Sequence, residues 1–242
     1  MQAVRLLFGK YGGKVQVDGA VQLIPPNSVV VTNRATAPCG ANSNLQYFDF
    51  YPADFKHLYA DVVDLLGVTH GTLFWRAPIR AVKAQDDVIS VLELLAKGSP
   101  DTLLRFAYIY CLGVDRRYFT ALLQHIMTGD EPFFDFIETH ALNQWSVARY
   151  ALEFNMPLRK FNLLFQEKYG LPAKRWLLER RLTRARELLL STPMRVLDIA
   201  LECGFSNHGH FTESFRKRYL CNPTQFRLRA QAALTPAISH AG

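Results

Sequence analysis

Cationic side chains gather in the second half of the chain, and many fall on one face of a segment with helical periodicity. Residues 132–242 carry 16 basic and 9 acidic side chains, whereas residues 1–131 carry 12 of each, so the net charge of +7 lies entirely in the later part. Rows of such groups bind phosphates, which indicates a polyanionic partner. Charge alone does not separate a nucleic acid from an anionic membrane. The cationic face of the segment 173–190 consists of Lys174, Arg175, Arg180, Arg181, Arg184 and Arg186.

Residue combinations typical of catalysis or metal binding are not recognisable. The sequence 208–210, His-Gly-His, has no third ligand nearby, and His57 and His70 are isolated. We find no Gly-rich phosphate loop, no Ser/His/Asp set and no Cys/His set. We therefore expect no enzyme activity, no metal and no cofactor.

The four cysteines form no Cys-x-x-Cys pair, so reduced thiols are expected, with Cys221 near a helix end the most exposed. No run approaches the ~20 apolar residues of a membrane-spanning helix, and the N-terminus shows no secretory signal. We expect a cytoplasmic protein that does not interact with membranes.

Residues 1–52 have the pattern of short strands separated by turns. The pairs 12–13 (Gly-Gly) and 18–19 (Asp-Gly) are hairpin signals, and the turn 25–27 precedes the β-branched run 28–32. This spacing indicates a small barrel or a sandwich. From residue 53 onward the periodicity is helical, in the ranges 54–66, 86–97, 101–112 and 115–128. The break at 129–132 separates an N-terminal domain, 1–131, from a C-terminal domain, 132–242.

The C-terminal domain begins with a predicted helix–turn–helix arrangement. A short helix, 133–140, follows Pro132. Ser146 then caps the helix 147–154, and the break 155–157 leads into a helix that Gly170 ends. Two short helices joined by a tight turn form a helix-turn-helix motif. Phe161, Leu164 and Phe165 define the core face of its second helix.

A long helix, 173–190, leads to a second motif of the same kind. The helix 196–203, the turn 204–206 and the helix 207–219 repeat the first arrangement. Eighteen residues span roughly 27 Å, which suits a strut between units one DNA turn, about 34 Å, apart. A last short helix runs from Pro223 through Phe226, and the end of the chain after Gln231 is expected to fray.

The sequences 198–206 (Asp-Ile-Ala-Leu-Glu-Cys-Gly-Phe-Ser) and 222–227 (Asn-Pro-Thr-Gln-Phe-Arg), with Phe211 and Phe215 between them, resemble the signature of AraC/XylS regulators. Residues 142–146, 153–156 and 176–181 are most similar to the type III secretion activators of the ExsA/VirF kind. Leu220 departs from the family pattern, because many members have Gly there, and a positive φ is expected to cost it about 1 kcal/mol.

This resemblance implies a fold class and the roles of individual residues. The fold would be α+β, with a small cupin-like β-barrel and helices followed by an all-α double helix-turn-helix domain. Base edges would be contacted from the start of each recognition helix, by Arg159, Asn162, His208, Thr212 and Glu213. Phosphates would be contacted by Lys160, Lys168, Arg180, Arg216, Lys217 and Arg218.

The resemblance also implies partners. These are double-stranded DNA, RNA polymerase and, with a type III secretion role, a regulatory chaperone or antiactivator protein. A homodimer is an option, through apolar helices containing Leu103, Leu104, Tyr108, Tyr118, Leu122 and Leu123, although packing within the domain explains them equally well.

The function expected is sequence-specific activation of virulence or type III secretion genes. The alternatives are a regulator of catabolic or stress genes that answers a small molecule, a β-barrel enzyme, and a module whose basic half binds acidic proteins.

Overall fold

The β-branched run Ser28–Thr32 forms strand β4 at the centre of the first sheet, and all five of its residues are buried. β4 pairs antiparallel with β1 (Val4–Gly9), and β1 pairs on its other side with β6 (Gln46–Phe50). The short strand β7 (Ala81–Lys83), which the sequence pattern did not predict, completes the order β6-β1-β4-β7.

A second sheet has the order β3-β2-β5, formed by β2 (Gly13–Val17), β3 (Ala20–Ile24) and β5 (Thr36–Cys39). Asp18 and Gly19, with φ of 49° and 87°, make the two-residue turn between β2 and β3, so this predicted hairpin is confirmed. The predicted hairpin at Gly12-Gly13 is wrong, because β1 and β2 belong to different sheets.

The core joins the two sheets face to face. Leu7 and Val30 of the first sheet pack against Val15, Val17 and Ile24 of the second. The described strands form two open sheets, so the cupin-like closed barrel is a wrong expectation: closure needs hydrogen bonds between the outer strands, and none joins them in the described ranges. The mixed α+β class is confirmed, and these strands have the sandwich arrangement that the strand spacing left open.

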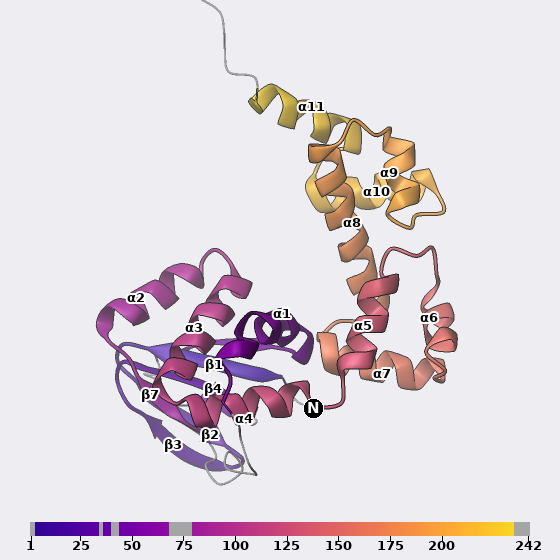
Figure 1. Ribbon diagram of the computed structural model, residues 1–242. Coiled ribbons are helices and arrows are strands. Elements are labelled where there is room, and N and C mark those ends of the chain that lie inside the picture. The colour runs from indigo at the N-terminus through magenta and orange to yellow at the C-terminus, as the bar shows by residue number, and fades with distance from the viewer. Residues whose placement is uncertain (1–2, 34–35, 40–43, 68–78, 235–242) are drawn as a thin grey trace, which may run out of the picture. The chain divides into compact units, whose positions relative to one another are not determined.

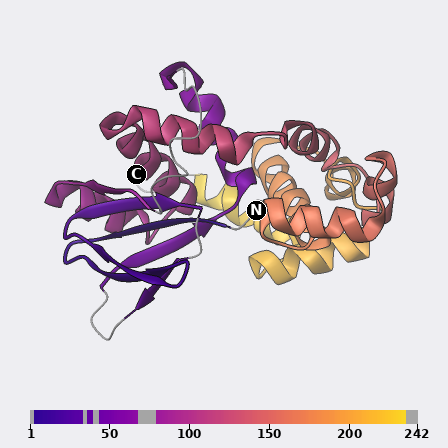
Figure 2. The ribbon, with the colours of Figure 1, turned by 90° about the horizontal axis from the view of Figure 1, so that it is seen from below.

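Four helices and a short 3₁₀ turn accompany the sheets, close to the predicted ranges. They are α1 (Pro52–Val62), η1 (Val63–Leu65), α2 (Asp86–Leu95), α3 (Pro100–Val114) and α4 (Arg116–Met127). Figures 1 and 2 show α2 and α3 on the side of the β6-β1-β4-β7 sheet that faces away from β2 and β3. The apolar residues considered above for dimerisation are buried in this unit, and the Tyr108 hydroxyl donates to the Phe119 carbonyl at 2.8 Å.

Seven helices follow, and all except the last match their predicted ranges closely. They are α5 (Glu131–His140), α6 (Val147–Glu153), α7 (Leu158–Tyr169), α8 (Ala173–Ser191), α9 (Val196–Glu202), α10 (His208–Tyr219) and α11 (Pro223–Leu234). The last helix extends well beyond Phe226, where the sequence pattern placed its end. Figure 1 shows α8 running from the α5–α7 group to the α9–α11 group.

The computed structural model describes residues 3–33, 36–39, 44–67 and 79–234. The chain forms two units. Residues 1–131 together with 164–170 are the N-terminal unit, and residues 132–163 together with 171–242 are the C-terminal unit. The C-terminal half of α7 therefore groups with the first unit. The end of the predicted frayed tail lies outside the described residues.

Candidate nucleic-acid interface

The first helix-turn-helix motif consists of α6, a tight turn and α7. The Ser146 hydroxyl caps α6 by accepting from the Arg149 backbone N–H at 3.3 Å. Asn155, with φ of 51°, reverses the chain before α7. Phe161 is fully buried on the inner face of α7, with its ring 5.7 Å from Phe133. Because that face is fixed in the core, the opposite face of the first α7 turns is exposed, and it carries Arg159, Lys160 and Asn162.

The second motif repeats this design with α9, a turn and α10. Gly204, with φ of 78°, provides the turn. The Asn207 side chain caps α10 by accepting from the His210 backbone N–H at 3.0 Å. Phe211 and Phe215 are fully buried against α8 and α9. The first turn of α10 is consequently presented to solvent.

The three predicted base-contacting residues of α10 have different surroundings. His208 is exposed. Glu213 is exposed and pairs with Lys217 one turn later at 2.6 Å, and the hydrogen bond from Lys217 lowers the pKa of the Glu213 carboxyl. Glu213 is therefore an ionised acceptor. Thr212 is half-buried, and its hydroxyl oxygen is buried without a hydrogen-bond partner in the described structure, so in this conformation it does not face a base.

Four of the six predicted phosphate-contacting residues are exposed, namely Lys160, Arg180, Arg216 and Lys217. Among the described residues, none of these four forms an ion pair with another helix; Lys217 pairs within α10 with Glu213. Arg218 is exposed but pairs with Glu179 of α8, Nε to Oε2, at 2.8 Å. This pair links α10 to α8, and the hydrogen bond to Glu179 raises the pKa of the Arg218 guanidinium.

Lys168 differs from the other predicted phosphate-contacting residues, because its side chain is only 8% exposed. Its Nζ lies 2.6 Å from Asp130 and 3.3 Å from Glu167. A phosphate would have to displace these carboxylates, so Lys168 as it lies here serves the packing of α7.

The structure also shows two arginines whose roles the sequence pattern missed. Arg181 was assigned to the cationic face of α8, yet it is half-buried and donates to the backbone carbonyls of Ala141, Asn143 and Trp145. Arg227 of α11 donates to the carbonyls of Leu189 and Met194. Backbone carbonyls leave no trace in side-chain periodicity, so the sequence held no signal for either contact.

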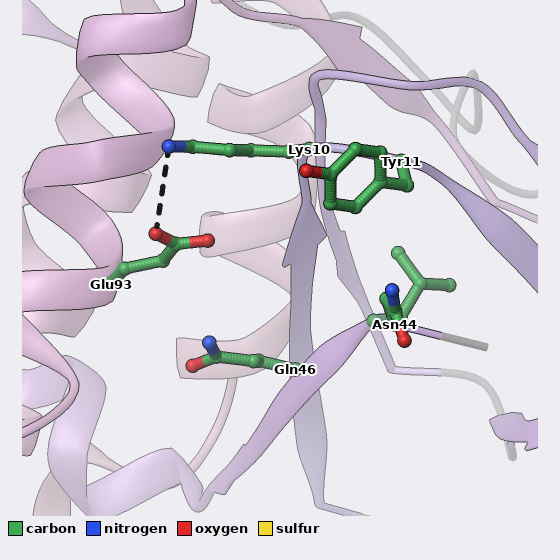
Figure 3. Close-up of a pocket in the computed structure, with 6 residues that line it drawn as sticks. Lys10, Tyr11, Asn44, Gln46 and Glu93 are labelled. Carbon is green, nitrogen blue, oxygen red and sulfur yellow. Dashed lines mark ion pairs between the residues drawn. The ribbon is translucent and has the colours of Figure 1, made fainter. Parts of the chain in front are cut away.

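A small polar pocket of about 410 Å³ lies in the N-terminal unit. Figure 3 shows Lys10 and Glu93 on one side of it, with Nζ and Oε2 3.9 Å apart. Tyr11, Asn44, Leu45 and Gln46 complete the lining. The lining thus combines two opposite charges, two side-chain amides and one aromatic ring.

Two further observations concern metals and membranes. Within the described ranges, no group of three or more His, Cys, Asp or Glu side chains is placed to hold a metal ion. The helices of the described chain include none with the length and apolar character needed to cross a membrane.

Two helix-turn-helix motifs joined by one long helix define a class of DNA-binding domain, and comparisons with known proteins agree. A family model for a helix-turn-helix domain matches residues 150–229. The thermoregulatory protein LcrF of Yersinia pestis is 32% identical over 183 residues, which cover 72% of this chain and 67% of LcrF. The chain belongs to the AraC/XylS family of transcription regulators.

Two other relatives match a smaller share of their own length. The virulence regulon transcriptional activator VirF of Yersinia enterocolitica is 40% identical over 149 residues, covering 61% of this chain and 53% of VirF. The transcriptional regulator ExsA of Pseudomonas aeruginosa is 42% identical over 92 residues, covering 38% of this chain and 33% of ExsA. The matched region thus spans about half of VirF and a third of ExsA.

Proposed function

We propose that this chain is a sequence-specific transcriptional activator that inserts α7 and α10 into successive major grooves of DNA. The observation that carries the proposal is the repeated exposure of polar side chains at a helix start. These are Arg159, Lys160 and Asn162 on α7, and His208 and Glu213 on α10, and the two helices lie towards opposite ends of α8 (Figure 1). The 19 residues of α8 span about 28 Å. This length suits motifs that read one face of a duplex, about 34 Å per turn.

The proposed base contacts follow from side-chain chemistry. Arg159 can donate to guanine O6 and N7, Asn162 can pair with adenine, and Glu213 can accept from cytosine N4 after releasing Lys217. His208 and Thr212 would contact neighbouring bases, Thr212 after turning its hydroxyl outward. Phosphates would be held by Lys160, Arg180, Arg216, Lys217 and Arg218, with Lys168 contributing only after leaving Asp130.

The regulated genes are, in this proposal, those of virulence and type III secretion. The relative VirF is a virulence regulon transcriptional activator. The resemblance of residues 142–146, 153–156 and 176–181 to type III secretion activators supports the finer assignment. We propose a cytoplasmic protein without enzyme activity. Residues 132–242 would bind DNA, and residues 1–131 would regulate.

Activation requires contact with RNA polymerase, and α9 offers a surface for it. Leu197, Asp198, Leu201 and Glu202 are all exposed on this helix, which is not the recognition helix of its motif. A chaperone or antiactivator protein, or a second copy of the chain, would act through the N-terminal unit.

Selection from a randomised duplex library by the full chain tests the proposal. The full chain is needed because Asp130, the partner of Lys168, precedes Pro132. We expect enrichment of two short blocks about 10 base pairs apart, with affinity that falls steeply as salt rises. Salt-sensitive binding without any enriched sequence would contradict it and favour a module that binds acidic partners by charge.

The pocket of Figure 3 favours a second candidate, a regulator of catabolic or stress genes that responds to a small polar molecule. The Lys10–Glu93 pair could hold a ligand that carries both charges. Saturable binding of such a ligand, lost in Lys10→Ala and accompanied by a change in DNA affinity, would support this candidate over the first.

A further inference from the structure

Arg181 of α8 holds the loop that leads into the first helix-turn-helix motif, through backbone carbonyls of that loop. Its Nε donates to the Ala141 oxygen at 3.3 Å, and its Nη2 donates to the oxygens of Asn143 and, at 3.4 Å, Trp145. These three residues belong to the loop between α5 and α6. A guanidinium is a planar fork of five donors, so it fixes both the position and the direction of the groups that it holds.

The same loop meets the turn of the second motif at Gly204. A Cβ on Gly204 would overlap the carbonyl oxygen of Leu142 and would lie 3.2 Å from the Arg181 Nε. The turn of the second motif therefore approaches the loop that leads into the first motif so closely that no side chain fits between them. We call Arg181, Gly204 and the loop 141–145 the motif junction.

Arg227 makes a comparable attachment at the far end of α8. Its Nε donates to the Leu189 oxygen at 3.2 Å, and its Nη1 donates to the Met194 oxygen at 2.7 Å. These bonds tie α11 to the end of α8 and to the segment that precedes α9. Arg227 thus fastens α11 to α8, and Arg218 fastens α10 to α8. Arg181 differs from both, because it lies where the turn of the second motif meets the loop 141–145.

We infer that Arg181 is a specificity-determining positioning residue: through the motif junction it fixes the spacing and phase of the two base blocks that the protein accepts. This inference rests on the proposed reading of DNA by α7 and α10. One added base pair moves the second block by about 3.4 Å and rotates it by roughly 35°. Two rigidly connected motifs cannot follow that shift. Two flexibly connected motifs can follow it, but they lose conformational entropy when they bind a correctly spaced site, and this weakens their binding there.

The test measures binding of the full chain to a duplex that the wild-type protein has selected from a random library. Matched duplexes carry one scrambled block, or one or two base pairs inserted between the blocks. Arg181→Met removes the donors and keeps the stem, and Arg181→Lys keeps the charge without the fork. Gly204→Ala disturbs the junction from the other side. Arg229→Met, at an exposed arginine of α11, is the matched control.

We expect Arg181→Met, Arg181→Lys and Gly204→Ala to bind single-block duplexes like wild type. On the intact duplex their affinity should fall about tenfold, and inserted base pairs should cost them less than they cost wild type. The control should keep the wild-type spacing profile, and thermal unfolding identifies the variants that fold.

Two results would overturn the inference. One is an unchanged spacing profile in those Arg181 and Gly204 variants that fold. The other is an equal loss of affinity on single-block and two-block duplexes, which indicates a purely structural role. If wild type enriches no paired blocks, the proposed function fails first, and the inference fails with it.

Discussion

Arginine side chains of the C-terminal unit occupy three environments, and each environment decides what the guanidinium can do. Arg159 is exposed at the start of α7, where it can donate to a base. Arg218 is held by Glu179, so it must exchange a carboxylate for a phosphate. Arg181 is occupied by backbone carbonyls and shapes the protein rather than contacting the ligand. The sequence shows that an arginine can bind anions. Only the structure shows whether its guanidinium is free to contact DNA or is held by other groups of the protein.

The neighbouring residues Arg159 and Lys160 should respond differently to truncation. We expect Arg159→Ala to weaken binding of the selected duplex by about 1–3 kcal/mol and to relax the preference at one base pair. Lys160→Ala should weaken binding of all sequences alike and reduce the magnitude of the slope of log affinity against log salt by about 1. Titrations of each variant against duplexes with single base changes check this. Uniform weakening by both substitutions would remove Arg159 from the base-reading set.

Cysteine reactivity should follow burial. Burial raises the pKa of the Cys203 thiol to about 12 and that of Cys111 higher still, so both stay protonated and unreactive near pH 8. Cys221, expected to be the most exposed, is also buried, whereas Cys39 is partly exposed. Brief alkylation followed by mass spectrometry should find Cys39 modified first. In denaturant, all four cysteines should be alkylated at similar rates. Early modification of Cys203 or Cys111 would show that the core opens.

At the scale of elements, prediction succeeded where local chemistry decides. Ser146 was predicted to cap α6 and residues 204–206 to form the turn before α10, and the structure confirms both. Sheet topology depends on partners distant in sequence, so Gly12-Gly13 resembled a hairpin although β1 pairs with β4 and β6. The three-residue β7 is too short to show alternation.

The end of α10 yields a stability prediction. Leu220 has φ of 60°, as its departure from the family pattern led us to expect, and its side chain is 88% exposed. Leu220→Gly should therefore raise the free energy of unfolding by up to about 1 kcal/mol, because the left-handed conformation costs glycine nothing and little packing is lost. Leu220→Ala keeps the Cβ and should change little. Denaturant titration compares the two, and equal values would place the strain elsewhere.

At the scale of the whole molecule, the sequence predicted which residues belong to the candidate site, but it did not predict which of them are accessible to DNA. Positions on α7 and α10 followed from the repeated motif, and most of the proposed residues are exposed. Lys168 was expected to contact phosphate, yet Asp130, 38 positions earlier, holds it in a nearly buried pair. No periodicity in the sequence connects two such residues, since only the tertiary fold brings them together.

The asymmetric charge of the chain leads to a final prediction. All seven net positive charges lie in residues 132–242, and five exposed cations are proposed to meet phosphates. Each neutralised phosphate contributes about −0.9 to the slope of log affinity against log salt, so we expect a slope between about −4 and −5. With such a slope, the fourfold rise in salt from 50 to 200 mM should lower the affinity for the selected duplex roughly several hundredfold. Glu179→Gln, which frees Arg218 from its ion pair, should leave the slope unchanged, because Arg218 is already counted among the five cations. A wild-type slope near −1 would mean that this cationic surface does not face the DNA, and it would require a different docking of α7 and α10.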